Sequence, residues 1–231
     1  MDWSRQEADF RHRRQQSGHA GAGLYHGHTF LRLVDIRGYE NLMYDMADGE
    51  SRLDALVEMV EAVNLDVLRR VVSWSPDWVG YPEDLDMQIG PMLSPEHFRR
   101  YIKPSYSRMM AIAREAGLPV HMHSDGDIRH LLPDLLGAGV ECINLQDLVN
   151  GIDWIRDNLK GRVCIDLDVD RQKVVRFGTP KDIHELILRE VRELGNPEGG
   201  LMLRVDMYYG VPLENIAALM DALEEYSTYW S

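Results

Sequence analysis

Two histidines at alternate positions are the first residues of this sequence whose types and spacing suggest chemistry. His121 and His123 lie at the end of a predicted strand, residues 118–123. Successive side chains of a strand point to opposite faces, so the two imidazoles share one face. Such a pair can hold a metal ion or a polar substrate, or it can hydrogen-bond to neighbours in a polar barrel mouth. The pair by itself leaves both interpretations open.

Aspartates end a second predicted strand, residues 163–169, at alternate positions: Asp166, Asp168 and Asp170. Like charges on one face resist ionising together, so this cluster requires a metal, another cation or arginine partners. Arg171 and Arg204 are candidates for the last role. We take Asp168 and Asp170 as candidate catalytic residues and Asp166 as a candidate substrate contact. Structural pairing with arginine is the alternative.

The last predicted strand, residues 201–205, leads into three polar residues that share one face: Arg204, Asp206 and Tyr208. Arg204 and Tyr208 are candidate catalytic residues. Asp206 is a candidate third metal ligand beside His121 and His123, because catalytic zinc sites commonly combine three protein ligands with an open position.

An acidic loop follows another predicted strand, residues 78–81. Its Asp84 and Asp86 are candidate substrate contacts, and a simply solvated loop is the alternative. Asp127 has the position of a helix N-cap. Five further histidines form no pattern with other potential ligands and are expected to be surface or structural residues: His26, His28, His97, His130 and His184.

Alternating strand and helix patterns must position these side chains. Helical spacing of apolar residues predicts long helices over residues 51–73, 94–116 and 180–194, the second kinked at Pro104. The six candidate strands are residues 30–36, 78–81, 118–123, 141–145, 163–169 and 201–205.

This alternation predicts parallel βα units in an α/β fold. A closed (β/α)₈ TIM barrel needs eight units, so six units indicate an incomplete barrel that lacks the first two. Residues 28–231 are predicted to form the barrel domain, and residues 1–27 a polar N-terminal arm. Ligands of such folds gather where the strands end, which is where the candidate residues lie.

Composition narrows the class of partner. The chain has 231 residues and a formal charge of −13, which argues against nucleic acid and anionic membranes. No apolar run is long enough for a membrane span, and the first residues do not form a signal peptide. The two cysteines, Cys142 and Cys164, lie in apolar strand-like runs and are expected to be reduced. We therefore expect a cytoplasmic protein that acts on a small molecule.

Several segments resemble the uroporphyrinogen decarboxylase superfamily, in particular its methyltransferase-like members. The matching segments, which follow the order of the family, are residues 28–43, 93–104, 121–128, 166–172, 177–180 and 211–216. The resemblance implies a TIM barrel with its active site at the barrel mouth.

The resemblance implies one of two chemistries. The decarboxylases act on a tetrapyrrole without cofactor or metal, through an arginine-bearing loop near the N-terminus that this sequence lacks. The methyltransferases use zinc, held by a His-x-Cys pair and a distant Cys, and a corrinoid-bearing partner protein. Here His121 and His123 stand at the pair, and the distant position falls near Val205 or Asp206, which moves the ligation to nitrogen and oxygen. Zinc would act as a Lewis acid that lowers the pKa of a thiol.

Three hypotheses result. The first is a metal-dependent methyltransferase-type enzyme, the second a cofactor-free tetrapyrrole decarboxylase relative, and the third a truncated barrel that serves as a binding or assembly partner without catalysis. An incomplete barrel exposes sheet edges and apolar faces, which proteins normally cover. We therefore expect either a homo-oligomer that closes the gap or a chain that is part of a longer protein.

Overall fold

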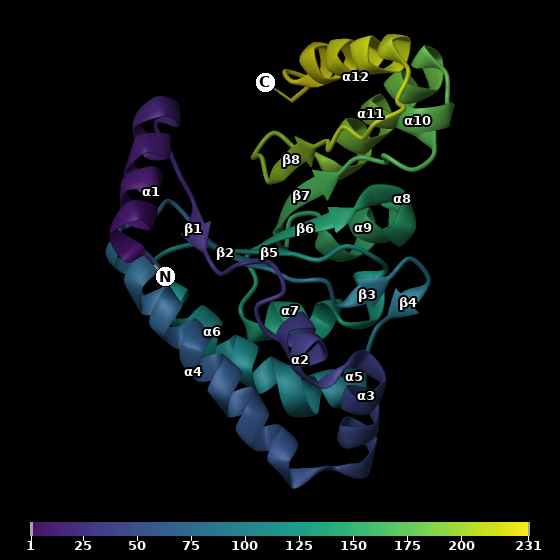
Figure 1. Ribbon diagram of the computed structural model, residues 1–231. Coiled ribbons are helices and arrows are strands. Elements are labelled where there is room, and N and C mark those ends of the chain that lie inside the picture. Colours follow the sequence, from purple (N-terminus) through teal and green to yellow (C-terminus); the bar gives the residue numbers. More distant parts are fainter. Residues whose placement is uncertain (1, 231) are drawn as a thin grey trace. The chain divides into compact units, whose positions relative to one another are not determined.

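The computed structural model describes residues 2–230, which form two compact units, Met1–Cys142 (unit 1) and Ile143–Ser231 (unit 2). Figure 1 shows the order of the elements along the chain. Each unit combines parallel strands with helices, and each is described by itself below. Among the described residues, no helix is both long and apolar enough to cross a membrane.

Unit 1 is built on three parallel strands in the order β1–β2–β5. They are β1 (Ala22–Gly23), β2 (Val79–Pro82) and β5 (Val120–His123). A short antiparallel hairpin, β3 (Asp86–Met87) and β4 (Gly90–Pro91), follows β2. The register pairs Pro82 with His123, so β2 and β5 end at the same level. The residues that follow Pro82 therefore lie beside His123.

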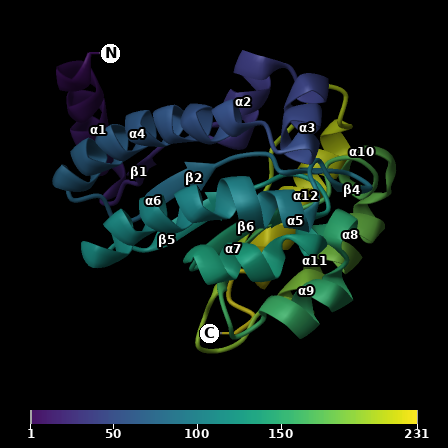
Figure 2. The same cartoon turned by 90° about the horizontal axis from the view of Figure 1, so that it is seen from below.

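The helices of unit 1 cover this sheet. They are α1 (Trp3–Ser17), α2 (Phe30–Arg37), α3 (Tyr39–Asp48), α4 (Ser51–Ser73), α5 (Pro95–His97), α6 (Lys103–Glu115) and α7 (Leu132–Ala138). Figures 1 and 2 show α4 and α6 side by side. The predicted helix at 51–73 is confirmed. The predicted kink is confirmed too, because a π-helical turn (Phe98–Ile102) precedes α6, whose first turn contains Pro104.

The strand predicted at residues 30–36 is wrong, because this segment is the helix α2. Its buried residues are Phe30 and Leu33, a spacing of three that suits one face of a helix. The sixth strand is instead β1, which lies in the predicted N-terminal arm and pairs with β2. A window of seven mostly apolar residues fits both patterns, and contacts from elsewhere in the chain decide between them.

Unit 2 contains the strands β6 (Cys142–Gln146, of which Cys142 closes unit 1), β7 (Cys164–Asp168) and β8 (Leu201–Arg204). Its helices are α8 (Asp147–Asn150), α9 (Ile152–Leu159), α10 (Val174–Phe177), α11 (Pro180–Leu194) and α12 (Leu213–Tyr226). β7 and β8 run parallel, with Asp168 opposite Arg204. Thr179 begins α11 with a capping box, as its position before Pro180 predicts.

The strand–helix alternation of the two units confirms the predicted α/β class. Apart from the β3–β4 hairpin, three strands fall in each unit. The pairings β1–β2, β2–β5 and β7–β8 are parallel, and helices follow these strands. Of the two cysteines, Cys142 is buried and Cys164 is partly exposed.

Candidate functional site

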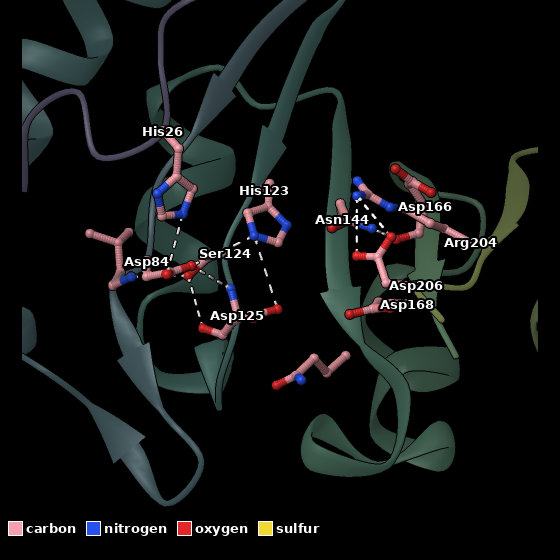
Figure 3. A network of polar contacts seen from close by, with 12 residues as sticks. His26, Asp84, His123, Ser124, Asp125, Asn144, Asp166, Asp168, Arg204 and Asp206 are labelled. Atoms are coloured by element: carbon pink, nitrogen blue, oxygen red, sulfur yellow. Dashed lines mark hydrogen bonds and ion pairs between the residues drawn. The ribbon is translucent and has the colours of Figure 1, made fainter. Parts of the chain in front are cut away.

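Three potential metal ligands meet where β2 and β5 end in unit 1: His26, Asp84 and His123 (Figure 3). His123 is the last residue of β5, and Asp84 lies two residues beyond β2. His26 comes from the loop between β1 and α2. The backbone N–H of Gly27 donates to the carbonyl of Pro82 over 3.1 Å, which holds this loop against the end of β2.

The distances within this cluster suit a metal ion. Nε2 of His26 lies 3.2 Å from Asp84 Oδ2, and Nε2 of His123 lies 3.6 Å from Asp84 Oδ1. The three ligand atoms all lie within 4.8 Å of one another. Donors around a tetrahedral zinc ion at 2.0–2.1 Å are about 3.3 Å apart. The same distances also suit direct ion pairs between imidazolium groups and the carboxylate, which is the metal-free interpretation.

The cluster is open to solvent on one side. The side chain of His26 is 50% exposed, that of Asp84 30% and that of His123 22%. Exposure of this kind gives a small molecule access to the ligand atoms. Since ligands of parallel α/β folds bind where the strands end, the cluster also has the expected place in the fold.

The turn after β5 orients Asp84. The backbone N–H of Asp125 donates to Asp84 Oδ1 over 3.2 Å, and Asp125 Oδ1 lies 4.0 Å from Nε2 of His123. Gly126 makes this turn possible. Its φ is +92°, and a Cβ there would lie 2.5 Å from the backbone carbonyl of Asp86.

Asp86, a predicted substrate contact, is buried in the hairpin that follows. Burial raises the pKa of its carboxyl to about 8, and the charges of Asp127 and Asp84 contribute to the rise. The carboxylate of Asp127, unlike that of Asp86, accepts two 2.7 Å hydrogen bonds from Arg129. Asp127 also caps the 3₁₀ turn Ile128–His130, as its predicted N-cap position indicates. Asp86 therefore does not lie in a simply solvated loop.

His26 is the ligand that sequence reasoning missed. It was expected to be a surface or structural residue because no other ligand lay near it in the predicted pattern. The missed strand β1 is the reason, since its pairing with β2 carries His26 to Asp84. His121 lies two residues before His123 on the same strand and is half-buried. Among the described residues, the cluster of close ligand atoms includes His123 and not His121.

Most candidate residues of unit 2 surround Arg171. Arg171 contacts Asp168 closely, and its Nη1 lies 4.0 Å from Asp206 Oδ2. Nη2 of Arg204 lies 3.3 Å from Asp206, and the guanidinium of Arg171 lies over the ring of Tyr208, 5.4 Å from its centre. Arg171 therefore pairs with Asp168, and both arginines lie within ion-pair distance of Asp206. The predicted metal ligands His121 and His123 belong to unit 1, and the third predicted ligand, Asp206, belongs to unit 2. This ligand set stays a prediction.

The remaining two aspartates of the run are buried. The backbone carbonyl of Asp166 accepts a 2.8 Å hydrogen bond from the Asn144 amide. The carboxylate of Asp170 accepts from the backbone N–H groups of Gln172 and Lys173, over 3.2 and 2.8 Å. These bonds make Asp170 the anchor of the turn after β7. Its assignment as catalytic and that of Asp166 as a substrate contact stay predictions.

Comparison with known proteins places the chain in a family. The sequence model of the uroporphyrinogen decarboxylase (URO-D) family matches residues 30–226. Over 138 residues, the chain is 26% identical to a methylated-thiol–coenzyme M methyltransferase of Methanosarcina mazei and 29% identical to a uroporphyrinogen decarboxylase of Thermus thermophilus. Both matches cover 58% of this chain, but only 34% and 38% of these relatives.

The fold has a solved counterpart. A methyltransferase from Methanosarcina mazei superposes with a TM-score of 0.71 at 15% identity, covering 96% of this chain and 64% of that one. At this identity the match concerns the fold, and it supports the predicted TIM-barrel type. Because the family match spans most of the described residues, the chain belongs to the uroporphyrinogen decarboxylase family.

Proposed function

We propose that this chain carries the active site of a metal-dependent, methyltransferase-type enzyme. The observation that carries the proposal is the convergence of His26, Asp84 and His123 where two parallel strands end, with their ligand atoms within 4.8 Å. The family membership and the similarity to methyltransferases in sequence and fold support the reaction class.

The proposed metal site differs from the one expected from sequence. His123 is common to both sets, whereas His26 and Asp84 take the places of His121 and Asp206. Two imidazoles and one carboxylate form a ligand set found at catalytic zinc, and zinc is the metal we propose. When bound, zinc would supply a Lewis acid that lowers the pKa of a coordinated thiol.

The protein side chains have distinct roles in this proposal. Asp84 contacts both imidazoles, so it directs their Nε2 atoms towards one point, and the N–H of Asp125 keeps its carboxylate in place. The exposed side of His26 leaves room for a thiol substrate. A corrinoid-bearing partner protein would present the methyl group, as the resemblance to the family's methyltransferases implies.

Zinc binding tests the proposal. Purified protein is loaded with zinc, dialysed and analysed for metal, and we expect one zinc ion per chain. His26→Ala, Asp84→Asn and His123→Ala are expected to lose the zinc ion. Their zinc affinity should fall by more than the roughly 10- to 100-fold loss that follows removal of a residue hydrogen-bonded to a metal ligand. His130→Ala changes an exposed histidine of the same unit and serves as the control.

The two ligand sets give opposite results. If His121→Ala and Asp206→Asn lose zinc while His26→Ala retains it, the set expected from sequence is right. Wild-type protein without stoichiometric zinc would contradict the metal-dependent function altogether.

A decarboxylase is the second candidate, favoured by the 29% identity to the Thermus thermophilus enzyme and by a half-exposed Arg204 that could bind substrate carboxylates. Incubation with uroporphyrinogen tests it, because formation of coproporphyrinogen would establish the activity. A protein that neither binds zinc nor forms this product would support the third hypothesis, a barrel without catalysis.

A further inference from the structure

The three proposed ligands depend on one buried carboxylate that binds no metal in the proposal. Glu83 immediately precedes Asp84 and is fully buried. Its Oε2 accepts hydrogen bonds from the backbone N–H groups of Thr29 and Phe30, over 2.9 and 3.0 Å. Its Oε1 accepts from the N–H of Leu31 over 3.1 Å.

These bonds make Glu83 the cap of α2 from a distance of more than fifty residues along the chain. The first N–H groups of a helix need acceptors, and a carboxylate there also gains from the helix dipole. The residue at the N-cap position is Thr29, and within the described residues its side chain makes no capping bond. Its Oγ1 instead lies 2.6 Å from Nδ1 of His28. A remote cap fixes the helix to the end of β2, which a local cap would not do.

Further bonds join Glu83 to the other segments of the cluster. The hydroxyl of Tyr106, on α6, donates to Glu83 Oε2 over 2.9 Å. The backbone N–H of Glu83 donates to the carbonyl of His123 over 3.0 Å. Glu83 therefore contacts the segment that follows His26, is bonded in sequence to Asp84, and is hydrogen-bonded to His123.

We infer that Glu83 is a positioning residue of the proposed metal site. By capping α2, its side chain sets where the loop before the helix lies, and thereby the distance between His26 and Asp84. This inference rests on the proposed function, because it assigns Glu83 to the ligand set His26, Asp84 and His123.

The test compares the zinc affinity of wild-type protein with that of Glu83→Gln by competition with a chelator. The glutamine side chain is similar in size to that of glutamate. Its NH₂ group, however, must face at least one of the backbone N–H groups that donate to the carboxylate in wild type, and two donors cannot form a hydrogen bond. We expect zinc affinity to fall about 10- to 100-fold, the typical effect of losing a partner behind the ligands. The cobalt(II) absorption spectrum, which reports ligand geometry, should also change.

Glu61→Gln is the matched control. Glu61 is also buried in unit 1, and its carboxylate bonds Arg108 over 2.5 and 2.6 Å. That variant weakens the ion pair between a buried carboxylate and the half-exposed Arg108, and it leaves the hydrogen bonds described above for α2 and the ligand segments in place. Its zinc affinity and cobalt spectrum should therefore match wild type. A loss equal to that of Glu83→Gln would mean that the effect is general destabilisation and would overturn the inference.

The outcomes separate the inference from the proposed function. If wild type binds zinc and Glu83→Gln binds it equally, Glu83 does not position the site, although the site stands. If wild type binds no zinc, both fail. Should Glu83→Gln not fold, Tyr106→Phe removes one of the four bonds to the carboxylate. Its zinc affinity should fall about two- to tenfold, the worth of one hydrogen bond, and an unchanged affinity would overturn the inference.

Discussion

A buried carboxyl in unit 2 gives a prediction that the structure makes quantitative. Glu190, on α11, is fully buried. Burial, and then the neighbouring Asp147 and Asp170, raise its pKa well above the usual value. The folded protein therefore keeps a proton on Glu190 that the unfolded chain releases near pH 4.3.

The sign of the pH dependence follows from this proton. Above pH 4.3 the folded state binds one more proton than the unfolded state, so stability falls as pH rises, until the folded pKa is passed. The slope is about 1.4 kcal/mol per pH unit for one proton. Glu190→Gln removes this proton but keeps the size of the side chain. From pH 5 up to the pH at which Glu190 ionises in the folded protein, the stability of the variant relative to wild type should therefore rise with pH, at no more than this slope.

The comparison across pH cancels other effects of the substitution. Burying the amide adds a penalty of about 1–3 kcal/mol that does not depend on pH. Burial also raises the pKa of Asp147, which neighbours Glu190, so the difference between the two proteins reports on these two carboxyls together. Urea denaturation at pH 5, 6 and 7 measures both stabilities, with fluorescence of Trp230, which contacts α11 through Val191, as a probe of unit 2.

Glu185→Gln, on the exposed face of the same helix, is the control and should show no such difference. Parallel stability curves for wild type and Glu190→Gln between pH 5 and 7 would refute the reasoning. They would mean that Glu190 is ionised in the folded protein or that water reaches it.

Two further predictions concern unit 1. Gly126→Ala places a Cβ against the backbone of Asp86 at a positive φ, so we expect the free energy of unfolding to fall by roughly 1–3 kcal/mol. Urea denaturation measures this change, and an unfolding midpoint equal to that of wild type would contradict the close approach of this turn to Asp86. Met59 and Val63 are exposed apolar residues of α4 beside a cavity of about 450 Å³, and we expect this face to contribute to the predicted homo-oligomer. Light scattering of Met59→Glu should then show a smaller mass than wild type, whereas a monomeric wild type would contradict the oligomer.

The sequence by itself determined the class of fold and the ends of the strands that matter. Apolar periodicity is a local property, so it predicted the helix at 51–73 and the strands that end at His123 and near Asp84. Turn and capping residues act on their immediate neighbours, and Asp127 and Thr179 cap as their positions predict.

Only the tertiary structure decided the composition of the candidate site. The segment after His28 is a helix because Glu83, far along the chain, accepts its first N–H groups, and His26 reaches Asp84 because β1 pairs with β2. Likewise, the approach of Arg171 to Asp206 and the burial of Asp86 depend on segments that meet in space. Periodicity and capping patterns act within a few residues, whereas these contacts join residues that no spacing in the sequence relates.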